Sequence, residues 1–451
     1  MNLTIKSLLI GINESLTLFI VFPAIIFLGI YLTIQLRFVQ ITKLKMSFSC
    51  LLKKDEGGKG NISHYQAIAA VLAGNFGTGN ISGMAIALST GGPGALVWMW
   101  IMAFLGSAIQ YTSCFLGVKY RKQTAEGEYV GGPMYYLADG LGLKALGTLF
   151  AILTIFGALT VGNLAQVNSI ALPLQALGLP PIVSGCVLAV LVGMVILGGI
   201  ERVSRLASFI VPIKAFLYLG TALVIIGLHF DQVGTAFSLM LKAAFDKQAA
   251  VGGVLGFGML KALTAGFDRG IFATDAGTGI VPILQASAKT KSPVIDGIIT
   301  LVTPFLVMIV CTATGLVLLV TGAWQQLDLR STNMVTYAFE QGLGSKFGAY
   351  IVIIALLLFA YTTILAWSCC ADKAINFLFN GRYVKSFKYI YMALVPLGAM
   401  MHVDFIWLLA DISISLMLIT NLIGVAGLSQ QVIGESRSFF KQTDPQQVTE
   451  N

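Results

Sequence analysis

The fold of this chain is decided by two glycine-rich stretches, Ala73-Gly74-Asn75-Phe76-Gly77-Thr78-Gly79-Asn80-Ile81-Ser82-Gly83 and Gly266-Phe267-Asp268-Arg269-Gly270-Ile271-Phe272-Ala273-Thr274-Asp275-Ala276-Gly277-Thr278-Gly279. Both lie inside long apolar segments. One glycine costs a helix about 1 kcal/mol relative to alanine, so a cluster is expected to interrupt it. At membrane depth an interruption survives only where the freed backbone groups face a cavity, a ligand or other protein groups. The two stretches therefore predict two broken helices around a buried polar site.

The composition places most of the chain in lipid. Of 451 residues, 57% are hydrophobic and 11% are charged, whereas a soluble domain carries roughly a quarter charged residues. The six cysteines lack metal-ligand or disulfide-framework spacing. The net charge of +8 does not indicate nucleic acid, because the basic residues are scattered through short loops. Since only helices or closed barrels satisfy the backbone in lipid, we predict an all-α polytopic membrane protein.

Eleven apolar segments are interpreted as membrane spans, and the tenth of them is the shortest. Their expected ranges are 15–37, 61–90, 92–118, 146–172, 182–200, 206–228, 251–280, 294–322, 348–370, 389–402 and 405–432. The first has no evident cleavage site and is interpreted as a retained anchor. We predict one transmembrane transport domain over 1–434 and a separate cytoplasmic tail over 435–451.

The basic residues predict an orientation in the membrane. Nineteen Lys and Arg residues fall in one alternating set of loops, and five fall in the other: Lys6, Lys242, Lys247, Arg330 and Lys346. Loops rich in Lys and Arg stay in the cytoplasm. We therefore expect a multi-pass protein of the inner or plasma membrane, with the N-terminus outside and the C-terminus cytoplasmic.

The placement of the glycine-rich stretches indicates an internal repeat. When 15–37 is set aside, the other segments form two sets of five, 61–228 and 251–432, and an interrupted helix opens each set. Because five is odd, the second set crosses in the opposite sense. Such paired broken helices are typical of secondary transporters with a site at mid-membrane. The alternative, two tightly packed helix faces with incidental polar residues, does not account for this placement.

A broken helix offers two kinds of polar group. The N–H groups from Gly77 to Asn80 are suited to a carboxylate, with help from the positive end of the helix dipole. Bare carbonyl groups are expected from Ala73 to Phe76, and they are suited to a hard cation or an ammonium group. A zwitterionic amino acid together with a monovalent cation would satisfy both ends, whereas a neutral sugar would use neither.

Further motifs occur in order along the chain. They are Gly77-Thr78-Gly79-Asn80-Ile81-Ser82-Gly83, Gly91-Gly92-Pro93-Gly94-Ala95 with Trp98-Met99-Trp100, Gly131-Gly132-Pro133-Met134-Tyr135-Tyr136, Arg269-Gly270-Ile271-Phe272 with Ala276-Gly277, Thr362-Thr363-Ile364-Leu365 with Trp367-Ser368, and Ala410-Asp411 with Asn421-Leu422. Together they resemble the alanine or glycine:cation symporter family, also called sodium:alanine symporters, whose members are similar to the leucine-transporter fold.

The resemblance implies a transporter, not an enzyme, that takes up alanine, glycine or another small neutral amino acid with sodium by alternating access. It implies no organic cofactor, and it leaves the oligomeric state open. The implied substrate-binding residues are Asn75, Gly77, Thr78, Gly79, Asn80, Gln166, Phe272, Thr274, Thr363 and Trp367. We add Asp275, because a lone ion at the second break would be costly unless it lines or braces the site. The implied sodium ligands are the carbonyl groups of Ala73, Phe76 and Phe359 and the hydroxyl groups of Thr362 and Thr363.

Four positions depart from the family pattern. They are Ala273-Thr274-Asp275 in place of Ser-Asn-Glu, Cys369-Cys370-Ala371-Asp372 in place of Tyr-Tyr-Gly-Glu, Thr420 in place of Pro, and Ile200-Glu201-Arg202 in place of the usual basic pattern. The first departure lies at the implied site and changes its size and hydrogen bonding. The small-amino-acid class is therefore better supported than alanine itself.

Several residues have a second interpretation. Asp275 either lines the site or forms a structural ion pair with Arg269 or Lys261. Lys214 is interpreted as a side chain that extends towards a membrane interface, and Gln166 is equally consistent with contacts between helices.

Trp367 and the two threonines also have structural interpretations, as a packing aromatic and as helical hydroxyls that bond to their own turn. Zinc-protease, serine-hydrolase and P-loop motifs are absent from the sequence. A channel and a proton-coupled transporter of another small amino acid stay open as alternatives.

Overall fold

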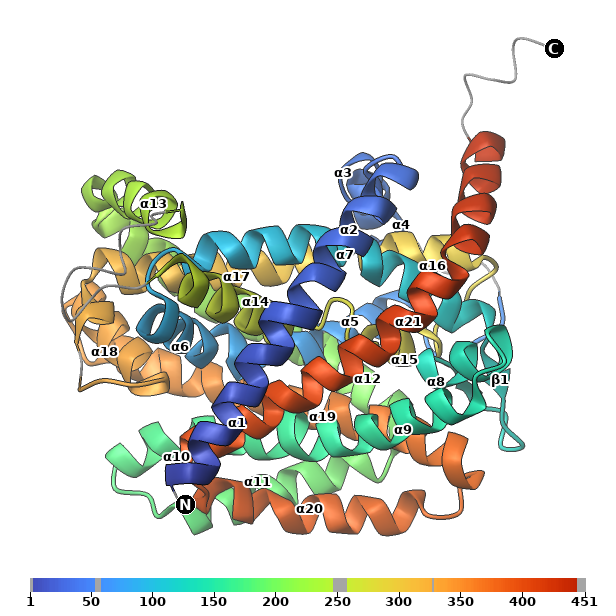
Figure 1. The fold of residues 1–451 in the computed structure, drawn as a ribbon. Coiled ribbons are helices and arrows are strands. Elements are labelled where there is room, and N and C mark those ends of the chain that lie inside the picture. Colours follow the sequence, from blue (N-terminus) through green and yellow to red (C-terminus); the bar gives the residue numbers. More distant parts are fainter. Residues whose placement is uncertain (1–2, 53–57, 246–257, 327, 444–451) are drawn as a thin grey trace.

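The computed structural model describes residues 3–52, 58–245, 258–326 and 328–443, and these are almost entirely helical (Figure 1). Seven helical segments of the described residues are long and apolar enough to cross a membrane: Ser7–Gln35, Ala95–Lys119, Lys144–Gln175, Gly199–Leu228, Pro293–Val320, Phe347–Phe379 and Phe405–Gln442. The other predicted spans correspond to single helices of 16 and 17 residues and to the halves of the broken helices. These are too short to be recognised by length alone.

The first half of the chain contains the first broken helix, in which η denotes a short π- or 3₁₀-helix. Its elements are α1 (Leu3–Leu16), η1 (Thr17–Val21), α2 (Phe22–Gln35), α3 (Val39–Thr42), α4 (Leu44–Leu52), α5 (His64–Asn75), η2 (Thr78–Asn80), α6 (Ser82–Gly91), α7 (Ala95–Lys119), β1 (Lys122–Gln123), β2 (Tyr129–Val130), α8 (Pro133–Tyr135), η3 (Tyr136–Gly140), α9 (Lys144–Leu159), η4 (Thr160–Leu164), α10 (Ala165–Ala176), α11 (Pro181–Ile196) and α12 (Gly199–Leu228). The two strands form a short antiparallel hairpin, with Lys122 paired to Val130.

The second half contains the second broken helix. Its elements are α13 (Phe230–Phe245), α14 (Met259–Thr274), α15 (Ile280–Gln285), α16 (Pro293–Thr300), α17 (Val302–Val320), η6 (Ala323–Gln325), α18 (Thr332–Leu343), α19 (Phe347–Phe379), α20 (Val384–Met400) and α21 (Val403–Thr443). Figure 1 shows α18 and α6 near one end of the bundle, with α8 and β1 near the other.

The first break follows from the backbone at two residues. Helix α5 begins with a capping box, in which Ser63 Oγ accepts from Gln66 N at 3.1 Å and Gln66 Oε1 accepts from Ser63 N at 3.0 Å. The helix ends at Asn75 because Phe76 turns to φ −80°, ψ 59° and Gly77 is extended at φ −93°, ψ −175°. The chain resumes as η2 and then as α6. The predicted interruption is confirmed.

The second break depends on left-handed backbone. Helix α14 ends at Thr274 because Asp275 has φ 50°, and Gly277 and Gly279 follow with φ 89° and 92°. Glycine adopts this conformation without steric cost, and aspartate is one of the few other residues that visit it. Helix α15 then starts at Ile280. The second predicted interruption is also confirmed.

The extra N-terminal span docks on the second broken helix. Asn13 Nδ2 donates to Asp268 Oδ2 at 3.1 Å and Thr17 Oγ1 donates to Asp268 Oδ1 at 2.5 Å. Phe22 packs edge-on against Phe267, with ring centroids 4.9 Å apart. Figure 1 shows this span, in blue, running across the bundle near α21, in red. A polar anchor and an aromatic contact therefore hold α14 from outside the repeat.

The last turns of α21 extend into the predicted tail, 435–451. Helix α21 continues to Thr443 because its last turns have partners on other helices: Glu435 pairs with Lys119, Ser436 shares a 2.7 Å hydrogen bond with Tyr111, and Arg437 donates to Gln35 Oε1 at 2.7 Å. The final residues of the tail, 444–451, and the start of the predicted 251–280 span, 251–257, lie outside the described residues. The other predicted ranges coincide with helices or helix pairs.

Candidate functional site

The carbonyl groups at the end of α5 are not bare, and this part of the sequence prediction is wrong. Each carbonyl from Leu72 to Phe76 accepts a hydrogen bond from a protein group. The pairs are Phe76 N with Leu72 O at 2.7 Å, Thr363 Oγ1 with Ala73 O at 2.8 Å and with Gly74 O at 3.2 Å, Asn80 Nδ2 with Asn75 O at 2.8 Å, and Lys214 Nζ with Phe76 O at 2.8 Å. Side chains from other parts of the chain therefore replace the missing helical turn.

Fewer of the backbone N–H groups on the other side of the break donate a hydrogen bond. Thr78 donates from both its backbone N, at 2.9 Å, and its hydroxyl, at 3.0 Å, to Gln166 Oε1 on α10. Gln166 in turn donates from Nε2 to Val161 O at 3.0 Å. Within the described residues, the N–H groups of Gly77 and Gly79 have no acceptor. This end of the break can therefore still receive an anionic group.

Asparagines connect the first break to its neighbours. Asn75 Nδ2 donates to Thr274 O, the last helical carbonyl of α14, at 2.7 Å. Cys311 Sγ lies 3.2 Å from Asn80 Oδ1, and Thr314 Oγ1 donates to Asn80 O at 3.0 Å, so α17 holds the start of α6. The structure thus joins the two broken helices directly at their interruptions, as expected for one shared site.

The second break contributes a buried carboxyl group. Asp275 is 2% exposed, and its Oδ1 has no hydrogen-bond partner among the described residues. The alternative ion pair with Arg269 is wrong, because Arg269 pairs with Asp411 on α21. Thr274 donates to Gly270 O at 2.7 Å and accepts from Ala276 N at 3.3 Å, which leaves its hydroxyl committed to the local turn. Asp275 is therefore an ionisable side chain at this break with an unpaired oxygen.

Two aromatic rings cover the junction of the breaks. The ring of Phe272 lies so close to Gly79 that a Cβ there would be 2.5 Å from its Cδ1 atom. Behind it, the Trp407 ring packs on the Phe272 ring at a tilt of 33°, with the ring centroids 4.7 Å apart, and the Arg269 guanidinium lies 5.1 Å from the Trp407 ring. Trp407 is not among the residues predicted from sequence; its position one helical turn before Asp411, a residue of a recognised motif, was the available signal.

Helix α19 places adjacent threonines on different partners. Thr363 contacts the α5 carbonyl groups, as described above, whereas Thr362 donates to Leu358 O at 3.0 Å and Phe359 O at 3.1 Å. Thr362 also accepts from the amine of Lys214. The five predicted sodium ligands therefore lie on the first broken helix and on α19, and the side chain of Lys214 reaches between these two elements.

The interpretation of Lys214 as an interfacial side chain is wrong. The residue is 0% exposed, and its amine points to the first break. The buried residues of α12 recur about every three or four positions, and Lys214 is one of them: Ile200, Val203, Ser204, Ala207, Val211, Lys214, Tyr218, Ala222 and Ile225. The exposed face is equally apolar, with Phe209, Ile213 and Phe216 on it. The sequence therefore carries no signal of which face packs on protein.

Trp367 lies one turn after Thr363 on α19 and is 1% exposed. It packs on the π-helical turn η4, where a Cβ at Gly162 would be 2.2 Å from Trp367 Cβ. The same region of the chain leads into α10 and Gln166. Trp367 therefore supports the helix that presents Gln166 to the break.

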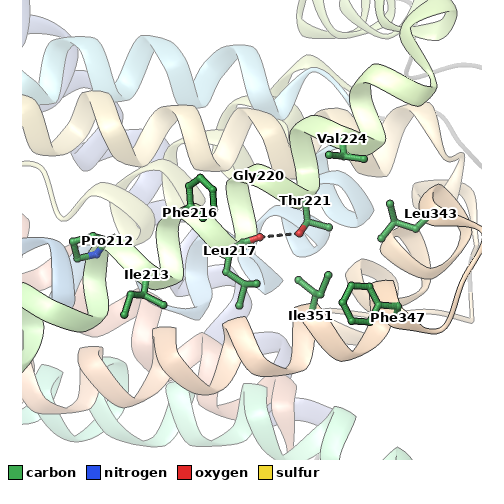
Figure 2. Close-up of a pocket in the computed structure, with 10 residues that line it drawn as sticks. All are labelled: Pro212, Ile213, Phe216, Leu217, Gly220, Thr221, Val224, Leu343, Phe347 and Ile351. Atoms are coloured by element: carbon green, nitrogen blue, oxygen red, sulfur yellow. Dashed lines mark hydrogen bonds between the residues drawn. The ribbon is translucent and has the colours of Figure 1, made fainter.

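The opposite face of α12 carries an open groove of about 930 Å³ between this helix and the start of α19 (Figure 2). Its lining is apolar, and Phe216 in it is 83% exposed. The one hydroxyl, that of Thr221, donates to Leu217 O at 2.8 Å. A groove with no free polar group does not match a zwitterion or an ion. The polar site lies on the other side of α12.

Comparison with known proteins gives relatives of nearly the full length. A chain of Haemophilus influenzae described as an uncharacterized transporter is 44% identical over 416 residues, covering 92% of this chain and 91% of the relative. A sodium/alanine symporter, AgcS, of Methanococcus maripaludis is 37% identical over 422 residues, covering 91% and 92%.

The arrangement of the helices is similar to that of solved transporters. The structure of MhsT in complex with L-phenylalanine superposes with a TM-score of 0.58 at 12% identity, covering 84% of this chain and 100% of MhsT. At this identity the likeness concerns the fold, which is leucine-transporter-like. The model of the sodium:alanine symporter family matches residues 2–451, and with the relatives above it shows that this multi-pass membrane protein belongs to the sodium:alanine symporter family.

Proposed function

We propose that the chain is a secondary active transporter that takes up a small neutral amino acid, alanine or glycine, together with sodium. The observation that carries this proposal is the hydrogen bond between Asn75 and Thr274 O, which joins two interrupted helices at buried polar termini. Membership of the sodium:alanine symporter family and the name of the Methanococcus maripaludis relative support the choice of ion and substrate.

The amino acid is placed between the two breaks. Its carboxylate takes the unoccupied N–H groups of Gly77 and Gly79, and its ammonium group faces Asp275, whose Oδ1 has no partner among the described residues. Phe272 covers this space next to Gly79. The remaining residues of the proposed substrate set line this space or fix the shape of the break: Asn75, Thr78, Asn80, Gln166, Thr274, Thr363 and Trp367.

Sodium is placed where the end of α5 meets α19. Thr363 Oγ1 and Ala73 O, which are 2.8 Å apart, can serve one ion because the hydroxyl group can turn its proton away and present a lone pair. The other predicted ligands, Phe76, Phe359 and Thr362, lie around the amine of Lys214. An ion at this junction ties the first broken helix to α19.

The proposed transport cycle couples these two positions by alternating access. Sodium holds α5 against α19, and this completes the surface that receives the amino acid. The repeats 61–228 and 251–432 then move relative to each other, and both ligands are released into the cytoplasm. The N-terminus is proposed to lie outside the membrane.

The test is uptake by purified full-length protein in liposomes. Labelled alanine and glycine are offered with an inward sodium gradient, a matched choline gradient or an inward proton gradient at equal membrane potential. We expect concentrative uptake only with sodium. Concentrative uptake with protons alone identifies a proton-coupled transporter, and equal downhill flux under all three conditions identifies a channel or uniporter. Absence of alanine and glycine uptake beside sodium-driven uptake of another amino acid rejects only the substrate.

A further inference from the structure

The amine of Lys214 lies at oxygen atoms that sequence analysis assigned to sodium. Lys214 Nζ is 2.8 Å from Phe76 O and donates to Thr362 Oγ1. It also lies 4.8 Å from the centre of the Phe359 ring, and the rings of Phe76 and Phe359 stack nearly parallel, 6.1 Å apart. Two of the five predicted ligand oxygens therefore accept from a lysine amine, and the ring of a third predicted ligand residue lies beside it.

The surroundings of the Lys214 amine are suited to a cation that is covalently attached to the protein. Lys214 is completely buried, and the ion pairs among the described residues do not include it. A buried ammonium group without a carboxylate must be stabilised by oxygen acceptors and aromatic faces, and this position provides both. The buried face of α12, with Val211 and Tyr218 one turn away on either side, fixes where the side chain enters.

We propose that Lys214 is a built-in cation that occupies the Phe76–Thr362 part of the junction, so that Phe76 and Thr362 do not bind the coupling sodium. This inference rests on the proposed function. It narrows the predicted sodium ligands to the Thr363 hydroxyl and the Ala73 carbonyl. A protonated lysine amine carries three N–H donors and no lone pair. It therefore cannot rotate to become a sodium ligand, as a hydroxyl group can. The hydroxyl of Thr363 can turn, and it therefore remains available as a ligand.

The neighbouring threonines give a matched test. Thr362→Val and Thr363→Val each remove one hydroxyl at nearly constant shape from adjacent positions on α19. Wild-type protein must first show sodium-driven uptake, and failure at that stage rejects the proposed function, not this inference. We then expect Thr363→Val to raise the half-saturating sodium concentration about tenfold or more, as for loss of a contact to an ion. Thr362→Val should change it by less than about twofold.

Removal of the amine gives a second readout that does not need transport. Lys214→Met keeps a long apolar side chain and frees Phe76 O and Thr362 Oγ1. In equilibrium binding of radioactive sodium to purified protein, we expect this variant to bind one more ion per chain than wild type, and we expect the double variant Lys214→Met with Thr362→Val to lose the extra ion.

Two results would overturn the inference. One is a comparable loss of sodium affinity in Thr362→Val and Thr363→Val, because Thr362 would then be a sodium ligand in the presence of Lys214. The other is unchanged sodium stoichiometry in folded Lys214→Met. If the lysine variant does not fold, the threonine pair still decides, since it leaves Lys214 in place.

Discussion

The replacement Gly77→Ala tests whether the first break is shaped to hold both ligands. A Cβ at Gly77 would lie 2.9 Å from Thr363 Oγ1 and 3.0 Å from Gln166 Oε1. Each oxygen would have to move by about 0.4–0.5 Å to restore the 3.4 Å of an ordinary contact. Insertion of a methyl group into a packed interior costs about 1–3 kcal/mol. The displaced atoms belong to the sodium junction and to the acceptor of Thr78.

At about 1.4 kcal/mol per tenfold change, this cost predicts a loss of roughly tenfold to a hundredfold in apparent affinity for both sodium and the amino acid. The matched control is Gly83→Ala in α6, where the added Cβ would meet only Arg269 Cδ at 3.7 Å. Alanine in a helix is favoured over glycine by about 0.5–1 kcal/mol. The control should therefore unfold at the same or a slightly higher temperature and keep its affinities within about twofold.

The assay is sodium-driven uptake in liposomes, with half-saturation measured separately for each ligand and thermal unfolding followed on the same preparations. Normal affinities in Gly77→Ala would refute the reasoning, because both oxygens would then be free to move without consequence. Equal damage in Gly83→Ala would also refute it, since added volume anywhere in the stretch would then suffice.

Three further predictions follow from single contacts. Gln166→Leu leaves the buried Thr78 N–H unpaired and should lower the free energy of unfolding by about 1–3 kcal/mol; thermal unfolding in detergent measures the loss, and unfolding at the wild-type temperature would contradict the role of Gln166 as the acceptor. Gly162→Ala brings a Cβ within 2.2 Å of Trp367 Cβ, which cannot swing away, so we expect little folded protein by size-exclusion chromatography. Asp275→Asn keeps a residue that tolerates left-handed backbone but removes the charge; amino-acid affinity measured by uptake should fall about tenfold or more, and normal affinity would assign Asp275 a structural role.

The interruptions could be predicted from sequence because their cause is local. Clusters of glycine weaken a helix wherever they occur, and the described helices stop at Asn75 and Thr274, inside the two quoted stretches. The apolar ranges were equally local, since length and hydropathy decide which segments can cross a membrane. The end of α21 could not be predicted from local sequence, because its polar last turns are held by partners such as Lys119 and Gln35 from distant parts of the chain.

The partners of buried charges could not be predicted, because they depend on how helices far apart in sequence face each other. Arg269 had a nearby acid in Asp275, yet it pairs with Asp411, 142 positions away. Both faces of α12 are apolar in sequence, so the burial of Lys214 and the groups it meets depend on the packing of α12 on α5 and α19. The sequence therefore predicted where the helices break, and tertiary packing decided which of the oxygens there are already in use.

The two ends of the first break differ in how far the protein already satisfies them, and this difference bears on coupling. The carbonyl end has a donor on every oxygen from Leu72 to Phe76, whereas the N–H groups of Gly77 and Gly79 have no acceptor in the described chain. An amino-acid carboxylate can bind the N–H end without displacing anything. Sodium would instead meet carbonyl groups that already accept a donor, and among these donors the Thr363 hydroxyl can turn in place. Both ligands then act on the same few residues between α5 and α6. Because linkage is reciprocal, the factor by which sodium raises amino-acid affinity must equal the factor by which the amino acid raises sodium affinity. Loss of the Thr363 hydroxyl should reduce both factors together, since it removes the contact through which we propose that sodium holds the break against α19.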